Sequence, residues 1–168
     1  RAGREIPDEP AALRELPGVG EYTAAAIASI AFGRPEPVVD GNVVRVGARF
    51  WALPGTALDP GLRRTIAMRL RSVIPHDRPG DFNQAMMELG ATCCRPVRPE
   101  CSACPMVAGC AARRRGDVQG FPAALPIRRV PQVRASVGVV WRKGRVLLAQ
   151  RPADGLLGGL WEFPGGKI

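Results

Sequence analysis

The first 112 residues place their apolar side chains at the spacing of α-helices. Pro10 suits the first position of a short helix, which ends at the Leu-Pro-Gly-Val-Gly sequence of residues 16–20. A second helix, from about Tyr22 to Phe32, is rich in Ala and Ile, so we expect it to be buried. This part of the chain is therefore predicted to be all-helical.

A short extended piece at residues 38–42 leads into the third predicted helix. That helix has an apolar face with Val43, Val46, Gly47 and Phe50 and an outward face with Arg45 and Arg49. The fourth helix begins at Asp59 and Pro60, a favourable cap followed by Pro at the first helical position. Its apolar positions are Leu62, Ile66, Leu70, Val73 and Ile74. A fifth helix runs from about Asp81 to Thr92.

The pattern changes after Arg113. Residues 113–134 are rich in Arg, Gly and Pro and have little periodicity, which predicts a linker. Two strands at 135–141 and 145–151, joined by a turn, then predict a hairpin. A hairpin cannot bury a core by itself. We therefore expect residues 135–168 to be the beginning of a second domain, and the chain to be truncated at both ends.

The charge of the chain narrows the class of partner. The formal net charge is +9, and 22 of the 24 basic residues are Arg, which forms forked contacts with phosphate. Such a balance indicates a nucleic-acid partner, although scattered solvated Arg residues remain an alternative. No apolar run approaches the ~20 residues of a membrane span, so we expect no membrane partner.

Four of the five cysteines lie within seventeen residues and predict a metal site. Their spacing is Cys94-x6-Cys101-x2-Cys104-x5-Cys110, with a single C-x2-C pair and one Cys at an unequal distance on either side. This pattern fits one [4Fe–4S] cluster better than the two C-x2-C pairs of a structural zinc site, although zinc remains an alternative. A thiol-ligated metal indicates a reducing cytoplasm. Cys93 is outside the pattern and is expected to be an ordinary buried thiol.

Two further features carry candidate chemistry. The two glycines of residues 16–20 allow close backbone approach and leave N–H groups at a helix N-terminus, where phosphate binds well. Twenty residues after Gly20 stands Asp40, followed by Gly41 and Asn42. An Asp at a helix start accepts backbone N–H groups and is expected to stay ionised. Either feature alone could be a simple turn or a helix cap.

Together, the cysteine spacing, the hairpin and Asp40 resemble the endonuclease III and adenine glycosylase superfamily. The resemblance implies a structural iron–sulfur cluster and binding to double-stranded DNA as a monomer. It also implies that Asp40 is the catalytic aspartate, which stabilises the cationic sugar formed when a base departs. The residues that would contact DNA are Pro17, Gly18, Val19, Gly20, Arg45, Arg95 and Arg98.

Three positions favour adenine glycosylases of the MutY type within this superfamily. Endonuclease III-type enzymes have a Lys where this chain has Tyr22, and no Lys occurs before Lys143, so a lyase ranks lower. The Asp-Gly-Asn triplet and the sequence Phe-Asn-Gln-Ala-Met-Met-Glu-Leu-Gly of residues 82–90 also resemble the MutY type. By resemblance, Asn42 would orient Asp40, and Tyr22 would lie beside the sugar.

The end of the chain agrees with this family. Residues 158–167 resemble the approach to a Nudix box, and adenine glycosylases carry a Nudix-like domain that helps recognise 8-oxoguanine. The predicted fold is thus mainly α: residues 1–112 form a helix-hairpin-helix glycosylase domain with a cluster loop at 94–110, the linker follows, and an α+β Nudix-like domain begins at 135.

The resulting hypothesis is a monofunctional adenine DNA glycosylase of base-excision repair. Acting in the bacterial cytoplasm on the nucleoid, it would remove adenine paired with 8-oxoguanine or guanine. The family's general-acid Glu lies well upstream of the hairpin and is missing here, so we expect residues 1–168 alone to be inactive. Two alternatives stay open: a non-catalytic iron–sulfur DNA-binding module, and a Nudix hydrolase fused to a DNA-binding domain.

Overall fold

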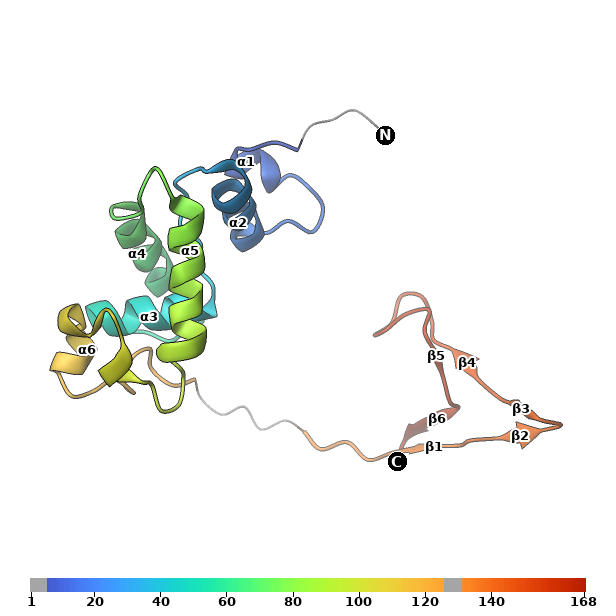
Figure 1. Cartoon of the computed structure of the whole chain (residues 1–168). Helices are drawn as coiled ribbons and strands as arrows, with labels where there is room; N and C mark the ends of the chain where they lie inside the picture. Colours follow the sequence, from blue (N-terminus) through green and yellow to red (C-terminus); the bar gives the residue numbers. More distant parts are fainter. Residues whose placement is uncertain (1–5, 126–130) are drawn as a thin grey trace. The chain divides into compact units, whose positions relative to one another are not determined.

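The computed structural model describes residues 6–125 and 131–168 and divides the chain into two compact units, Arg1–Pro126 and Ile127–Ile168 (Figure 1). Residues 113–125 of the predicted linker remain with the first unit, where the Ala123 amide donates to the Gly55 carbonyl at 2.8 Å. Residues 126–130 of that linker lie outside the described residues. The two units are described separately.

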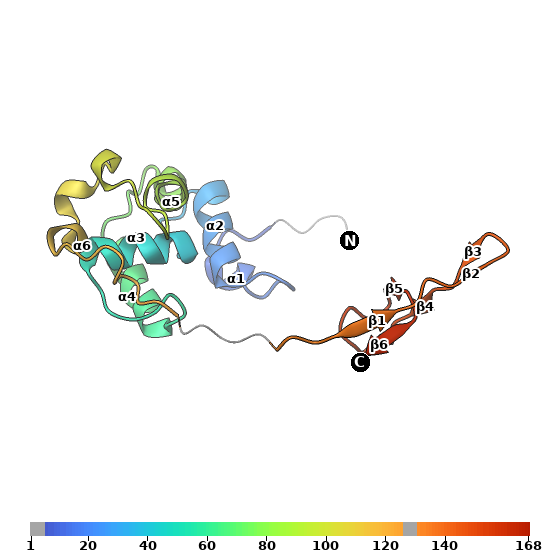
Figure 2. The same cartoon turned by 90° about the horizontal axis from the view of Figure 1, so that it is seen from below.

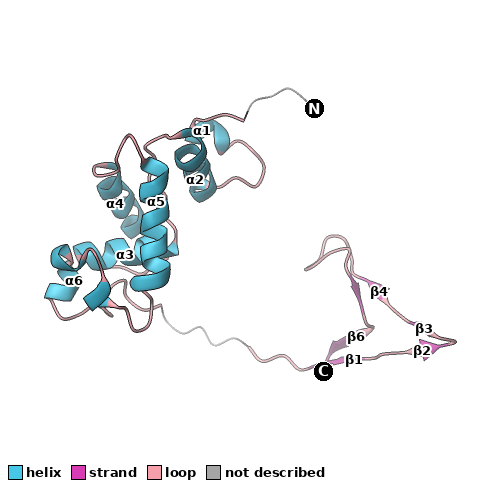
Figure 3. Cartoon of the chain, in the orientation of Figure 1, coloured by secondary structure: helices cyan, strands magenta, loops and turns pink. Residues whose placement is uncertain are grey.

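The described part of the first unit is helical, as its periodicity predicts (Figure 3). The helices are α1 Pro10–Leu13, α2 Glu21–Phe32, α3 Gly41–Trp51, α4 Pro60–Arg71, α5 Pro79–Glu88 and α6 Ala111–Arg114. Helix α5 continues into a π-helical turn, η1 Leu89–Cys93, and two short 3₁₀ helices, η2 Cys101–Ala103 and η3 Val107–Gly109, follow in the cysteine loop. Asp59 caps α4 by accepting the Gly61 amide at 2.7 Å, which confirms the predicted start.

Helix α3 lies at the centre of this unit and contacts α4, α5, η1 and α6 (Figures 1 and 2). The core cluster is formed by Val43, Val44, Val46, Ala48, Leu62, Ile66, Leu70 and Met86. Two sequence predictions are wrong here. Arg49 was expected to face outward but is only 3% exposed, and Val73, counted among the apolar positions of the fourth predicted helix, is 58% exposed and lies beyond the end of α4 at Arg71.

Helix α2 is buried on one face only. Its small residues Ala24, Ala25 and Ala28 are buried, whereas Ile30 and Phe32 are exposed, so the expectation of a fully buried helix is wrong. Ala24 and Ala28 pack against Leu13 of α1. Near its C-terminal end α2 also lies close to α5, since a Cβ at Gly80 would lie 2.9 Å from the Ile30 Cα.

One buried side chain joins α5, α2 and the extended piece before α3. Asn83 is 1% exposed, and its amide group donates to the Ser29 hydroxyl and to the Glu36 carbonyl, both at 2.9 Å. Its own carbonyl accepts the Val38 amide at 3.0 Å. Because a buried amide that satisfies three partners is costly to lose, Asn83 fixes the path of the chain just before Asp40.

The described part of the second unit consists of short antiparallel pairs. Strands β1 Ala135–Val137 and β6 Gly165–Lys167 pair, as do β2 Trp141–Arg142 with β3 Arg145–Val146, and β4 Ala149–Gln150 with β5 Trp161–Glu162. The turn at Lys143 and Gly144 lies where the hairpin was predicted, but only β2 and β3 pair across it; the outer parts of the two predicted strands, β1 and β4, pair with β6 and β5 instead. None of residues 131–168 is buried.

In the described parts of both units, no helix is long and apolar enough to cross a membrane.

Candidate functional site

The hairpin between α1 and α2 has the geometry that its two glycines predict. Gly18 has a φ of 83°, a conformation that disfavours any side chain, and Gly20 is the extended N-cap of α2. Pro17, Gly18 and Gly20 are exposed and Val19 is half-buried, so this backbone is accessible. The first N–H groups of α2 lie at the helix end where the sequence predicts that phosphate binds, and the phosphate contact stays a prediction.

Asp40 caps helix α3, as expected for an Asp at this position. One carboxylate oxygen accepts the Val43 amide at 2.7 Å, and the other accepts the Asn42 side-chain amide at 3.0 Å. The carboxylate is half-buried. Asn42 therefore holds Asp40 in one orientation, which is the arrangement that the family resemblance implies; the catalytic roles of both stay predictions.

Arg45 continues this chain of contacts toward the cysteine loop. Its guanidinium donates to the Asn42 side-chain oxygen at 2.8 Å, to the Gly90 carbonyl at 2.7 Å and to the Cys94 carbonyl at 2.8 Å. Burial, and next the charge of Arg49, lower the pKa of Arg45. Arg45 is thus half-buried and engaged within the protein, contrary to the outward position expected from the sequence, and a DNA contact through it remains untested.

Gly90 is where η1 comes closest to the Asp40 end of α3. A Cβ at Gly90 would lie 2.6 Å from the Asn42 Cβ, a distance that real Cβ atoms essentially never show. It would also lie 3.0 Å from the Asn42 carbonyl oxygen. The glycine is therefore required for Asn42 to keep its position beside Asp40. In the sequence, Gly90 is only one of several glycines in a helical stretch, so its role could not be predicted from the sequence alone.

We expect Gly90→Ala to lower the free energy of unfolding by about 1–3 kcal/mol, because the methyl group overpacks this contact. Urea denaturation would measure the loss. The control is Gly41→Ala, also in a helix, where a Cβ meets nothing within 4 Å, so its stability should be unchanged or raised by up to ~1 kcal/mol. Equal effects of the two substitutions would contradict the steric explanation.

All five cysteines line one small cavity next to α3. The cavity is closed by Pro99, Val107, Val118 and Arg113, and none of the cysteines forms a disulfide. The structure thus brings Cys94, Cys101, Cys104 and Cys110 together. Among the residues described, however, no three His, Cys, Asp or Glu side chains are close enough to hold a single metal ion.

Cys93 differs from its sequence expectation. It is half-exposed rather than buried, its thiol donates to the Glu100 carbonyl at 3.3 Å, and it lines the same cavity as the other four. Partial burial, and then the neighbouring thiol of Cys104, raise the pKa of Cys93.

The two loop arginines predicted to contact DNA are exposed. Arg95 forms an ion pair with Glu100 in the same loop, so a phosphate would have to compete with that carboxylate. Arg98 has a φ of 52° and projects from the loop without an ion pair among the described residues. Both contacts stay predictions.

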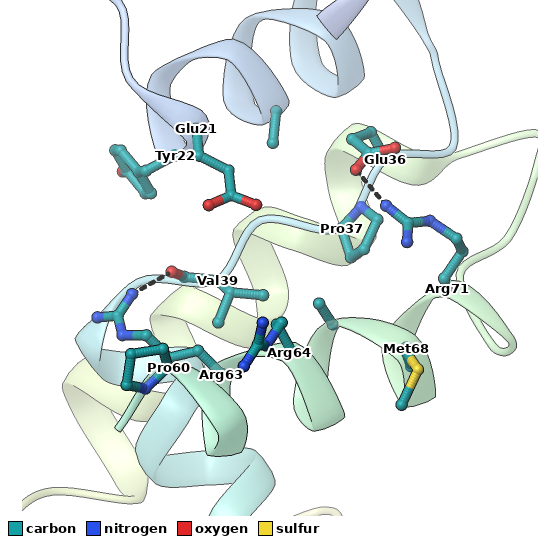
Figure 4. Close-up of a pocket in the computed structure, with 12 residues that line it drawn as sticks. Glu21, Tyr22, Glu36, Pro37, Val39, Pro60, Arg63, Arg64, Met68 and Arg71 are labelled. Carbon is teal, nitrogen blue, oxygen red and sulfur yellow. Dashed lines mark hydrogen bonds and ion pairs between the residues drawn. The ribbon is translucent and has the colours of Figure 1, made fainter. Parts of the chain in front are cut away.

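Tyr22 lines a cleft of about 500 Å³ between α2 and α4 (Figure 4). The tyrosine is 48% exposed, and its hydroxyl points to the Met87 sulfur at 3.8 Å. Val39, the neighbour of Asp40 in sequence, lines the same cleft, and its carbonyl accepts from the Arg63 guanidinium at 3.2 Å. Tyr22 and Val39, the residue before Asp40, thus border one cleft.

Comparison with known proteins shows to which class of proteins this fold is similar. Residues 136–168 match the NUDIX domain family. The fold resembles a thermostable thymine-DNA glycosylase with a TM-score of 0.57 and 29% identity, covering 66% of this chain and 50% of that one. It also resembles endonuclease III in a non-covalent DNA complex, with a TM-score of 0.55 and 29% identity, covering 67% and 50%. The first unit has the helix-hairpin-helix fold of endonuclease III-like glycosylases, and a Nudix-like segment follows it.

Sequence similarity identifies the branch of this glycosylase superfamily to which the chain is related. The chain is 40% identical to the adenine DNA glycosylase of Arabidopsis thaliana (97% of this chain, 28% of that protein) and 38% identical to that of Homo sapiens (96% and 38%). The relative from Mycolicibacterium smegmatis is 40% identical, covering 74% and 40%. The chain is a homologue of the adenine DNA glycosylases of the MutY type. It spans less than half the length of these curated relatives.

Proposed function

We propose that the protein is a monofunctional adenine DNA glycosylase of base-excision repair, acting on duplex DNA in which adenine faces 8-oxoguanine or guanine. The observation that carries this proposal is the carboxylate of Asp40, fixed at the start of α3 by the Val43 amide and the Asn42 side chain. The similarity to adenine DNA glycosylases supports the choice of base. We infer action as a monomer in a reducing cytoplasm, which suits five unpaired thiols.

In this proposal the bond between the sugar and adenine breaks with its electron pair leaving on the base. The carboxylate of Asp40 stabilises the positive charge that develops on the sugar, and water adds to the sugar to give an abasic site. Protonation of the departing adenine needs an acid, which we do not assign to Glu9 or Glu15, because Glu9 pairs with Arg34 and Glu15 is an exposed residue of the hairpin region.

We further propose that Cys94, Cys101, Cys104 and Cys110 hold one [4Fe–4S] cluster. The four thiols surround a single cavity, and their spacing along the chain, with one C-x2-C pair, suits a cluster better than zinc. When bound, the cluster would supply structure rather than chemistry at the sugar. The residues that contact its loop, Arg45 and Arg49, both lie on α3, so the loop and Asp40 share one helix.

The full-length protein is expected to release adenine from a duplex with one A·8-oxoguanine pair and to leave the strand uncut until alkali is added. Tyr22 stands where a lyase has its Lys, so no amine is available to attack the sugar. Gel analysis with and without alkali measures both steps. Strand cleavage without alkali would contradict the monofunctional assignment, and an intact base in every mispair would favour a non-catalytic DNA-binding module.

A further inference from the structure

Arg49 is a buried cation whose bonding partners come from two distant segments. Its guanidinium donates to the carbonyls of Arg95 at 2.7 Å, Pro96 at 3.2 Å and Cys94 at 3.3 Å, and to the Cys94 sulfur at 3.4 Å. It also donates to the Phe121 carbonyl at 2.9 Å. One side chain on α3 thus joins the cysteine loop to residues on the path toward the second unit.

The charge of Arg49 lacks an anion among the described groups. Its partners are neutral carbonyls and one sulfur, and Arg45, a second cation, donates to the same Cys94 carbonyl. A cation that is 3% exposed is costly to bury without a counter-charge. Thiolates that ligate an iron–sulfur cluster carry a net negative charge, and the Cys94 sulfur is where that charge would meet the guanidinium.

Residues 115–125, which include Phe121, make few other contacts with the rest of the first unit. Phe121 is half-buried against the core cluster, and Ala123 donates to the Gly55 carbonyl at 2.8 Å and forms a single bridge with Thr56. This is the last described stretch of the first unit. Its order therefore depends on a small number of contacts: Val118 lines the cysteine cavity, and the Arg49–Phe121 hydrogen bond joins the segment to the side chain that also holds the cysteine loop.

We propose that Arg49 couples cluster occupancy to the order of residues 115–125: the ligating thiolate balances its charge, and the balanced guanidinium fixes the Phe121 carbonyl. This inference rests on the proposed cluster. When the cluster is lost, the loop carbonyls move away, the cation is left without an anion, and Arg49 turns toward water. The segment toward the second unit then loses its tie to α3.

Hydrogen exchange of the full-length protein tests this coupling. We expect peptides covering residues 115–125 to exchange about tenfold faster in cluster-free than in cluster-loaded wild-type protein. Arg49→Met should show the faster exchange even when loaded, and cluster removal should then add little, because the two changes act through the same contact. Arg49→Lys, which keeps the charge, should fall between wild type and Arg49→Met.

Arg63→Met is the matched control, since Arg63 also donates to main-chain carbonyls, those of Ala57 and Val39, but away from the cysteines. It should leave residues 115–125 as protected as in wild type. Iron and sulfide analysis is run on every sample. If the loaded sample has its full cluster content and residues 115–125 are equally protected in loaded and cluster-free protein, the coupling alone is overturned. Absence of iron from the wild-type protein would overturn the proposed cluster as well.

Discussion

Asp40→Asn in the full-length protein should reduce the single-turnover rate of adenine release by on the order of 10³-fold, because a neutral amide cannot stabilise a cationic sugar. The fold should survive, since Asn is as good an N-cap as Asp and can still accept the Val43 amide. Release of adenine from an A·8-oxoguanine duplex with enzyme in excess is the measurement. Affinity for the same duplex should change far less than the rate.

Asp59→Asn provides the matched control for charge removal at a helix cap. Asp59 begins α4 by accepting the Gly61 amide at 2.7 Å, much as Asp40 begins α3. If the effect at Asp40 came from helix capping, both substitutions would slow release equally. We expect Asp59→Asn to retain the wild-type rate; an Asp40→Asn protein as fast as wild type would remove the basis of the proposed function.

Cys94→Ala should lose most of the iron of the purified protein, whereas Cys93→Ala should keep it. Cys94 has the family spacing and accepts a hydrogen bond from Arg49, while the Cys93 thiol is directed to the Glu100 carbonyl. Because a bound cluster stabilises only the folded state, Cys94→Ala should also unfold at lower denaturant concentration. Iron and sulfide analysis together with urea unfolding measures both effects.

The opposite result, iron lost with Cys93→Ala and kept with Cys94→Ala, would show that the ligands were assigned to the wrong thiol. One zinc ion per chain without sulfide would refute the iron–sulfur proposal and support the zinc alternative. Comparing two neighbouring thiols of the same cavity controls for the general cost of removing a cysteine there.

Local features of this fold were predictable from sequence because they depend on neighbours along the chain. Helical periodicity located α1 to α5, and Asp40 and Asp59 were recognised as helix starts. The hairpin at 16–20 was recognisable because its turn needs particular residues. The pairing of β1 with β6 was not predicted, since its strands are thirty residues apart and carry little pattern.

The polar contacts that position the candidate site were missed for a different reason. Arg45 and Arg49, one turn apart on α3, resemble a solvated face, and only their contacts with a loop some 45 residues later reveal that they point inward. Asn83 likewise occupies a core position of α5, and its partners lie 45 to 54 residues away in sequence. A single sequence shows the charge or amide but not the distant carbonyl that satisfies it.

The π-helical turn η1 determines which of the two adjacent thiols, that of Cys93 or that of Cys94, occupies the ligand position. In this turn the Cys94 amide donates to the Leu89 carbonyl at 2.7 Å, five residues back, so one more residue is accommodated than in an α-helical turn. Successive helical residues differ by about 100° around the axis. Deleting one residue between Leu89 and Cys93 would therefore bring a different side chain to the ligand position, so the turn ties the identity of the ligand to the number of residues that precede it.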